Sequence, residues 1–276
     1  MNEFYQNIVT YKHLPFNLTL FDKNTENDLH HYPKHWHEYL ELNLTIKGTG
    51  VAWIDGNEYQ IKDHNVFIIN ANSIHQITGN PPFEDILGFC LQIDLSSFKN
   101  LFPNLKTYFH TTCNPAQTKK LIDEVSFLHQ LIQKEESTFD IYIQLIKIIK
   151  YLDENLSFDL GYQNSDKYKE RLLQISKYIL AHYNEPLDTY HLAEQFKMSQ
   201  SHLHKLFKDH FGQSIRQYIT EIRMMHAIDD LKYTDLSILE ISLKNGFPSN
   251  KAFTHDFKKR FEMTHNLYRN QLNKRK

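Results

Sequence analysis

The sequence predicts a two-domain α+β protein, with a small β-barrel and trailing helices in its N-terminal part and an all-helical domain in its C-terminal part. Three observations lead to this prediction. The chain has 276 residues, which is more than one typical domain of about 150 residues. Apolar residues alternate with polar ones in short runs between residues 36 and 93, as in strands. From residue 167 onward the spacing is helical and the segment repeats itself.

The N-terminal domain is expected at residues 1–160, with the barrel at about 15–112. Its alternating runs are LELNLTIKG, GVAWID, NEYQIKD, NVFIIN and ILGFCLQID, and the turn-forming segments GTG, DGN and GNPP break the pattern. Two amphipathic helices are expected within 115–156. They cover a face of the barrel, or the first of them also pairs with a partner subunit. The polar segment 157–166 is expected to be a linker.

The C-terminal domain is expected at residues 167–276 and contains the repeat. Leu203, Phe207 and Phe211 recur 50 residues later as Phe253, Phe257 and Phe261. Each repeat has a short apolar helix, a tight connection and a second helix with apolar anchors, which is the organisation of a helix-turn-helix. The two units are expected at about 188–211 and 237–261. A linker helix at about 214–233 would set them roughly 34 Å apart, one turn of DNA.

The second helix of each unit is expected to lie in the major groove of DNA. Its polar face offers the donors and acceptors that base edges require, and Ser199 and Ser249 occupy the N-cap positions. The expected DNA-binding residues are Ser199, Gln200, Ser201, His204, Lys205, Lys208, Ser249, Asn250, Lys251, Thr254, His255 and Lys258. Phosphate contacts are assigned to Lys208, Lys258, Lys259 and Arg260. For either helix-turn-helix alone, the alternative is a polar helix face that contacts only solvent. The repetition of the pattern favours DNA binding over this alternative.

Charge and cysteine content agree with this division. Residues 166–276 contain 19 Lys and Arg against 13 Asp and Glu, and residues 1–165 contain 12 against 20. A basic part of this kind suits contact with phosphates. Two cysteines are too few for a disulfide framework, and no apolar run approaches the roughly 18 residues of a membrane helix. The expected location is cytoplasmic, without a membrane partner.

The second helix-turn-helix resembles that of the AraC/XylS family of bacterial regulators. The family pattern is met by Glu240-Ile241-Ser242, Gly246-Phe247, Ser249-Asn250-Lys251, Phe253, Phe257-Lys258 and Thr264 through Tyr268-Arg269. Two residues depart from it, Glu262 and His265, and both concern the cap of the last helix. The resemblance implies binding to double-stranded promoter DNA, contact with RNA polymerase and a role as an activator. It also implies an N-terminal cupin-like barrel that binds a small effector or forms a homodimer.

A cupin pattern is present in the N-terminal domain. His35, His37, Glu41 and Gly48 match the first cupin motif, and His75 matches the later histidine. The Gly and Pro that normally precede that histidine are replaced by His64 and Asn70. The first three residues share parity on one expected strand, so their side chains would project to one face.

Three imidazoles and a carboxylate would suit a divalent transition metal, with His35, His37, Glu41 and His75 as candidate ligands. The alternatives are an effector pocket without metal and a purely structural role. The expected effector pocket comprises His35, His37, Tyr39, Glu41, Trp53 and His75, and a sugar is favoured by analogy alone. No cofactor is expected apart from this candidate metal.

The overall expectation is a ligand-responsive transcription regulator and not an enzyme. It would be a homodimer through the barrel or through the helix at 117–134. One alternative is a metal-dependent cupin enzyme with an appended DNA-binding domain, which substrate turnover would reveal. Another is a regulator that binds no effector.

Overall fold

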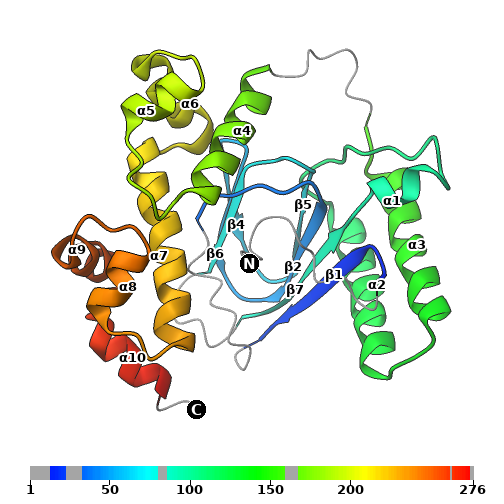
Figure 1. The fold of residues 1–276 in the computed structure, drawn as a ribbon. Helices are drawn as coiled ribbons and strands as arrows, with labels where there is room; N and C mark the ends of the chain where they lie inside the picture. Colours follow the sequence, from blue (N-terminus) through cyan, green and yellow to red (C-terminus); the bar gives the residue numbers. More distant parts are fainter. Residues whose placement is uncertain (1–12, 23–32, 80–85, 159–166, 262, 274–276) are drawn as a thin grey trace. The chain divides into compact units, whose positions relative to one another are not determined.

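The computed structural model describes residues 13–22, 33–79, 86–158, 167–261 and 263–273 (Figure 1). These residues form two compact units. The first contains residues 13–22, 35–79 and 86–158, and the second contains residues 33–34 and the helices from residue 167 onward. The predicted turn at 80–82, most of the predicted linker (159–166) and Glu262 lie outside the described residues.

Seven described strands form two antiparallel sheets in the first unit. The strands are β1 (Phe16–Phe21), β2 (Leu40–Lys47), β3 (Gly50–Ile54), β4 (Asn57–Ile61), β5 (Asn65–Ile69), β6 (His75–Gly79) and β7 (Leu87–Ile93). Their order is β1-β7-β2-β5 in one sheet and β4-β3-β6 in the other. The predicted cupin-like barrel is therefore not closed by pairing among the described strands. The short connection between β2 and β3 leads from one sheet to the other through Gly48, whose φ of 125° few other residues adopt.

Strand β2 separates two different environments. Leu40, Leu42 and Leu44 belong to a core that also contains residues of the helices that follow the strands. The alternating residues Glu41, Asn43 and Thr45 are buried on the other face. On that face, Phe67 and Ile69 of β5 pack with Ala52, Ile54 and Ile61 of the other sheet. The second face of β2 therefore looks into the space between the sheets.

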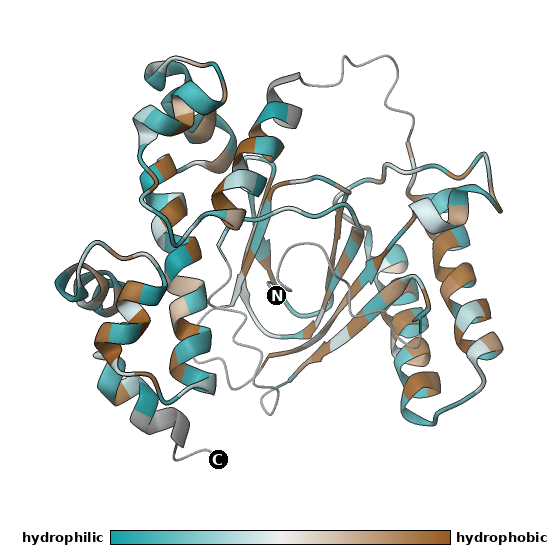
Figure 2. Ribbon diagram, viewed as in Figure 1, coloured by the Kyte–Doolittle hydropathy of each residue, from teal (hydrophilic) through white to brown (hydrophobic). Residues whose placement is uncertain are grey.

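The helices of the first unit are α1 (Ser96–Lys99), α2 (Pro115–Gln133) and α3 (Thr138–Asn155). Asn114 and Gln117 form a capping box that begins α2, and Pro115 stands at its first position. Leu121, Val125 and Leu128 of α2 are buried against the sheet core. Figure 2 shows apolar stripes on both long helices. The predicted covering of one sheet face by these helices is confirmed by this shared core.

The second unit is all helical. Its helices are α4 (Lys167–Ala181), α5 (Thr189–Gln195), α6 (Gln200–Phe211), α7 (Ile215–Tyr233), α8 (Ile238–Lys244), α9 (Asn250–Phe261) and α10 (His265–Asn273). Capping boxes begin α7 at Ser214 and α8 at Ser237. Phe253 and Phe257 of α9 pack with residues of α7, α8 and α10 in one apolar core. None of the helices in the described ranges is long and apolar enough to cross a membrane.

Candidate functional site

Helix α6 is the second helix of the first repeat. The Ser199 hydroxyl accepts the His202 N–H at 3.2 Å and begins the helix. Leu203, Leu206, Phe207 and Phe211 are buried, which agrees with the apolar anchors expected on this helix. The opposite face exposes Gln200, Ser201, His204, Lys205 and Lys208. The helix thus has a polar face with base-edge donors and acceptors along its length.

Helix α9 repeats this arrangement. The Ser249 hydroxyl accepts the Ala252 N–H at 3.1 Å, so the predicted cap is confirmed. Phe253 and Phe257 are buried. Asn250, Lys251, His255 and Lys258 are exposed. Thr254 differs, because it is partly buried and its hydroxyl lies 3.3 Å from Nε2 of His265 at the start of α10.

Hydrogen bonds of a buried asparagine stabilise the turn before α9, and the sequence did not predict them. Asn245 is buried, and its side-chain amide donates to Asp230 of α7 at 2.7 Å and to the Ile241 carbonyl at 2.9 Å. Lys244 forms a 2.6 Å ion pair with the same Asp230. Asp230 therefore joins the C-terminal end of α8 to α7.

Two basic side chains of α9 have different surroundings. Lys258 is exposed, whereas Arg260 is partly buried and interacts electrostatically with Glu221 of α7. Burial lowers the pKa of Arg260, and the Glu221 carboxylate opposes that shift. Arg260 thus faces α7, which differs from the phosphate contact expected of it.

The last helix is capped despite its two departures from the family pattern. The Thr264 hydroxyl accepts the Leu267 N–H at 3.3 Å. The His265 ring, which stands where the family has proline, stacks on Phe253 with an interplanar angle of 10°. His265 therefore joins α10 to the aromatic core of the second repeat.

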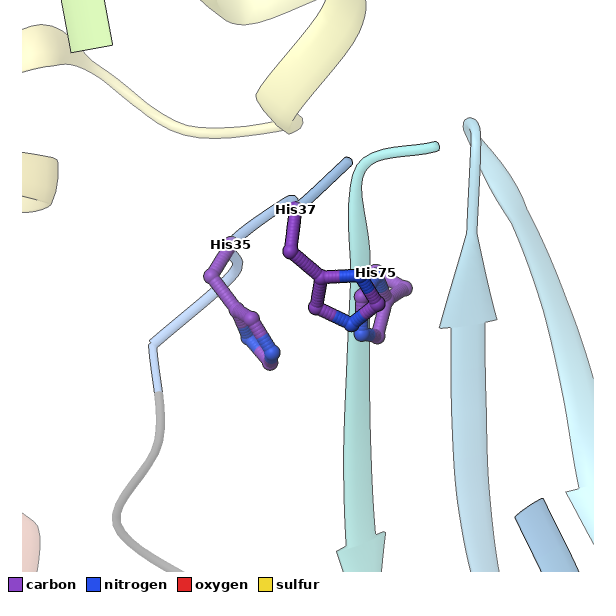
Figure 3. A group of neighbouring side chains, drawn as sticks. All are labelled: His35, His37 and His75. Atoms are coloured by element: carbon purple, nitrogen blue, oxygen red, sulfur yellow. The ribbon is translucent and has the colours of Figure 1, made fainter. Parts of the chain in front are cut away.

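Three histidines meet at one edge of the space between the sheets (Figure 3). Ligand atoms of His35, His37 and His75 all lie within 4.8 Å of one another. The expectation that His35, His37 and Glu41 share one strand is wrong, because β2 begins at Leu40. Instead, the His35 and His75 backbones form an isolated antiparallel bridge, with N–H···O distances of 2.9 and 2.8 Å. This bridge brings together two histidines that are 40 residues apart.

Backbone carbonyls orient two of these rings. His37 donates from Nδ1 to the Tyr39 carbonyl at 3.1 Å, and His75 donates from Nδ1 to the Ser73 carbonyl at 2.9 Å. Nε2 of His37 lies 3.0 Å from the Glu41 carboxylate. Nε2 of His75 is buried, has no hydrogen-bond partner among the described residues and is 3.7 Å from the same carboxylate. Proteins that bind metals through histidine hold the other ring nitrogen in this way.

Glu41 is the charge at the centre of the cluster. Burial alone would raise the pKa of its carboxyl, but the hydrogen bond with His37 and the charge of His75 outweigh burial and hold that pKa well below the usual range. Burial would likewise lower the pKa of His75, and Glu41 reverses this so that the pKa is raised. Gln92 of β7 donates to the carboxylate at 3.1 Å. The surroundings of Glu41 therefore favour the ionised form of its carboxyl group.

The remaining residues of the expected effector pocket lie at different distances from this cluster. The Tyr39 ring is 5.9 Å from the His37 ring. Trp53 pairs with Gln76, whereas its neighbour Ile54 pairs with His75. Because side chains alternate along a strand, Trp53 lies on the opposite face of its sheet from His75. The structure thus brings five of the six residues together and sets Trp53 apart.

Two families match the chain. The AraC-like ligand binding domain matches residues 24–146, and the Helix-turn-helix domain matches residues 192–271. The HTH-type transcriptional regulator YdeC of Bacillus subtilis (strain 168) is 25% identical over 246 residues, which are 84% of each chain. An HTH-type transcriptional regulator of Staphylococcus aureus (strain MRSA252) is 28% identical over 240 residues. This match covers 83% of the present chain but only 31% of that longer relative.

The crystal structure of ToxT from Vibrio cholerae O395 has the same fold. It matches with a TM-score of 0.51 at 15% identity, covering 94% of this chain and 98% of ToxT. A ligand-binding domain of two sheets and a domain with two helix-turn-helix units define a DNA-binding transcription regulator. Within that class, the chain belongs to the AraC/XylS family.

Proposed function

We propose that this regulator reads promoter DNA through α6 and α9 together. The observation that carries this proposal is the repetition of one design. Each of these helices is capped by a serine, buries an apolar stripe and exposes a polar face that ends in a lysine at the corresponding position, Lys208 or Lys258. Such faces provide the bidentate and single hydrogen bonds by which base edges are read.

Within this proposal the residues have different roles. Base contacts fall to the exposed residues of the first two turns, and phosphate contacts to Lys208 and Lys258. The exposed candidates for base contact are Gln200, Ser201, His204, Lys205, Asn250, Lys251 and His255. Ser199 and Ser249 set the helix N-termini against phosphate. Thr254 has a secondary role because its hydroxyl is engaged with His265.

The test is selection of genomic DNA fragments by the purified full chain, followed by sequencing of the retained fraction. We expect enrichment of sites with two short elements about one helical turn apart, lost in the variants Lys205→Ala and Lys251→Ala. Lys119→Ala removes an exposed lysine from α2 of the other unit and serves as the matched control. Equal retention of all fragments by every variant would contradict the proposal.

The first unit supplies the response to a small molecule. The buried polar residues between its sheets support this role, and a sugar is the ligand that the family resemblance favours. The resemblance also favours activation through contact with RNA polymerase. Titration of DNA affinity against a panel of monosaccharides tests the sugar. A panel that leaves both the DNA affinity and the melting temperature of the chain unchanged would exclude it.

A divalent transition metal is a second candidate ligand for the first unit. Its support is the histidine cluster, in which two rings already donate Nδ1 to carbonyls and His75 directs a buried, unbonded Nε2 toward the others. His35, His37 and His75 would hold the ion, and Glu41 lies beside them. A bound metal would supply either a sensing event or Lewis-acid chemistry, and turnover of a substrate would separate the two.

The metal is tested by calorimetric titration of the full chain with Zn²⁺ and by the visible spectrum with Co²⁺. We expect 1:1 binding that weakens at least tenfold in His35→Gln and His75→Gln. His64→Asn is the matched control, because His64 is exposed and its φ of 55° suits asparagine. Binding that is unchanged in both cluster variants would refute the site.

Homodimer formation is the remaining part of the proposal. Its support is the exposed apolar surface of the two long helices, where Phe127 of α2 and Phe139 and Ile143 of α3 are 47%, 81% and 51% exposed. Contiguous exposed apolar side chains are typical of interaction surfaces.

A further inference from the structure

Helix α7 packs with a different helix-turn-helix along each of its halves. In its first half, the ring of the buried Tyr218 lies 5.6 Å from the Phe207 ring and 4.7 Å from the Phe211 ring, both of α6. In its second half, apolar residues pack in the core that contains Phe253 and Phe257 of α9. The residues of this second half are Met224, Ala227, Ile228 and Leu231. The geometry of α6 relative to α9 therefore depends on how each helix is held on α7.

Glu221 lies on α7 between these two halves. The side-chain amide of Gln213 donates a hydrogen bond to its carboxylate at 3.1 Å. Gln213 belongs to the short connection between the end of α6 and the start of α7. The carboxylate of Glu221 thus anchors the segment that directly follows the first helix-turn-helix.

Arg260 of α9 approaches the same carboxylate from the second helix-turn-helix. Burial raises the pKa of the Glu221 carboxyl, and the charge of Arg260 opposes that shift. Burial lowers the pKa of Arg260, and the charge of Glu221 opposes it in turn. Each side chain is partly buried, so their attraction is less screened than that of an exposed pair. Glu221 is therefore linked to both repeats, by a hydrogen bond to one and by charge to the other.

Lys34, which belongs to the second unit, adds a positive charge on the side of α6. Its ammonium group donates a hydrogen bond to the carbonyl of Phe211, the last residue of α6, at 2.8 Å. The last carbonyls of a helix have no partner within it and carry partial negative charge, so a cation stabilises them. The charge of Lys34 also acts on Glu221. Two cations, one at the end of α6 and one on α9, thus share a single carboxylate.

The polar contacts of Glu221 restrict orientation more than the apolar contacts around it do. Apolar burial is not directional, so each helix-turn-helix could rotate slightly on α7 at little cost. Hydrogen bonds and the planar guanidinium group require particular directions. A partly buried carboxylate that lost its partners would be destabilised. Rotation of α9 away from α6 is therefore opposed chiefly where Glu221 connects them.

We propose that Glu221 is a positioning residue that fixes α9 relative to α6, and that it thereby determines which spacing between two DNA elements the chain accepts. The inference rests on the proposed function, in which both helices read DNA. One additional base pair moves the second element about 3.4 Å along the duplex and about 35° around it. A fixed pair of helices binds such a site poorly, whereas a loosened pair tolerates it.

The experiment measures the spacer preference of the full chain by fluorescence anisotropy. We define this preference as the ratio of two dissociation constants, for a spacer one base pair longer than the preferred one and for the preferred one. Both duplexes carry the two elements recovered by the fragment selection. Glu221→Gln keeps the side-chain shape and removes the charge that faces Arg260, so the ratio should fall about fivefold. A variant that is merely less stable would weaken binding to both duplexes and leave the ratio unchanged.

A double-mutant cycle tests whether Glu221 acts through Arg260. Arg260→Gln should lower the ratio as much as Glu221→Gln does, and the double variant should lower it no further, because each change removes the same pair. Asp235→Asn is the matched control for charge, since Asp235 is exposed and lies beyond the end of α7, and its ratio should equal that of the wild type.

Two results would overturn the proposal: a wild-type ratio in both single variants, or a fall in the double variant equal to the product of the single ones. These results leave sequence-specific binding by the wild type intact. A wild type that binds every spacer equally would contradict the proposed reading by both helices, and the present proposal with it. The two failures are therefore distinguished by the wild-type measurement alone.

Discussion

Gly246 packs directly against the backbone of Asn184. A Cβ atom built at Gly246 would lie 2.6 Å from the Asn184 Cα and 2.7 Å from its carbonyl oxygen, and the φ of Gly246 is +74°. Asn184 precedes the first helix-turn-helix, and Gly246 lies in the turn of the second. Two segments that are 62 residues apart are therefore held together by a contact that only glycine allows.

Gly246→Ala should strongly destabilise the C-terminal domain. The methyl group meets backbone atoms, which cannot move aside as a flexible side chain would, and the left-handed φ adds about 1 kcal/mol. We expect a loss of at least 2 kcal/mol in urea unfolding, together with weaker DNA binding. Gly212→Ala is the control, since Gly212 is exposed and has a φ of 66°, so it incurs mainly the backbone cost. Equal destabilisation by the two variants would show that the contact with Asn184 adds nothing to the backbone cost.

Lys258 and Arg260 should differ in their effect on the salt dependence of DNA binding. Lys258→Ala removes an exposed charge, and we expect the slope of log K against log salt to fall by about 1 for every DNA sequence. Arg260→Ala removes a group that faces Glu221, and we expect lower stability with an unchanged slope. Fluorescence anisotropy at several salt concentrations measures both slopes. A slope that falls in Arg260→Ala as it does in Lys258→Ala would place Arg260 on the phosphates.

The stability of the C-terminal domain should depend on pH through two opposed groups on α7. Burial lowers the pKa of His226 to about 4, with Asp230 raising it and Lys244 lowering it. Burial raises the pKa of Asp229 to about 6, with Lys232 opposing and Asp230 adding. As pH falls from 6.5 through 4, His226 must take up a proton against burial and stability is lost. As pH falls from 6 through 3.8, Asp229 becomes neutral and stability is gained.

The two contributions should therefore nearly cancel between pH 4 and 6. In the Asp229→Asn variant, the free energy of unfolding in urea should fall on acidification by on the order of 1 kcal/mol more than in the wild type. This value is reduced for solvent screening, because Asp229 is half-exposed. His226→Gln should show the opposite slope relative to wild type. Parallel pH profiles for the two variants and the wild type would rule out this pair of shifts.

Substitution of the exposed apolar residues on α2 and α3 should abolish the dimer. A buried aspartate in an apolar contact lacks a partner, so Phe127→Asp and Ile143→Asp are expected to convert a dimer to a monomer in sedimentation velocity. Phe102→Asp is the matched control, because Phe102 is similarly exposed at 42% and lies outside both helices. A dimer that persists in both helix variants would show that the interface does not involve these helices and would favour one formed by the sheets.

Helices α6 and α9 could be predicted from sequence because their signals are local. Ser199 caps α6 and Ser249 caps α9 within three residues, and the buried phenylalanines recur at helical spacing. Thr254 was expected on the exposed face of α9, and it is partly buried. Its engagement depends on His265, eleven residues away on another helix, which helical periodicity does not report.

The sequence predicted that the three histidines would lie close together, but it did not predict the local geometry that brings them there. Alternation within one strand was expected for His35 and His37, but both precede β2, and the bridge to His75 brings them together. The same limit applies to Asn245 with Asp230 and to Arg260 opposite Glu221. In each case a partner distant in sequence determines the role of the side chain, and a pattern along the chain carries no information about that partner.

The alternation of side chains along β2 has a consequence for how such regulators diversify. Substitutions at Leu40, Leu42 and Leu44 would disturb the core that the sheet shares with the helices, whereas substitutions at Asn43 and Thr45 would change buried polar positions on the opposite face and leave that core intact. One short strand thus carries two sets of positions that can vary independently of each other. Variation at every second residue can therefore alter the polar interior of the domain without a change of fold.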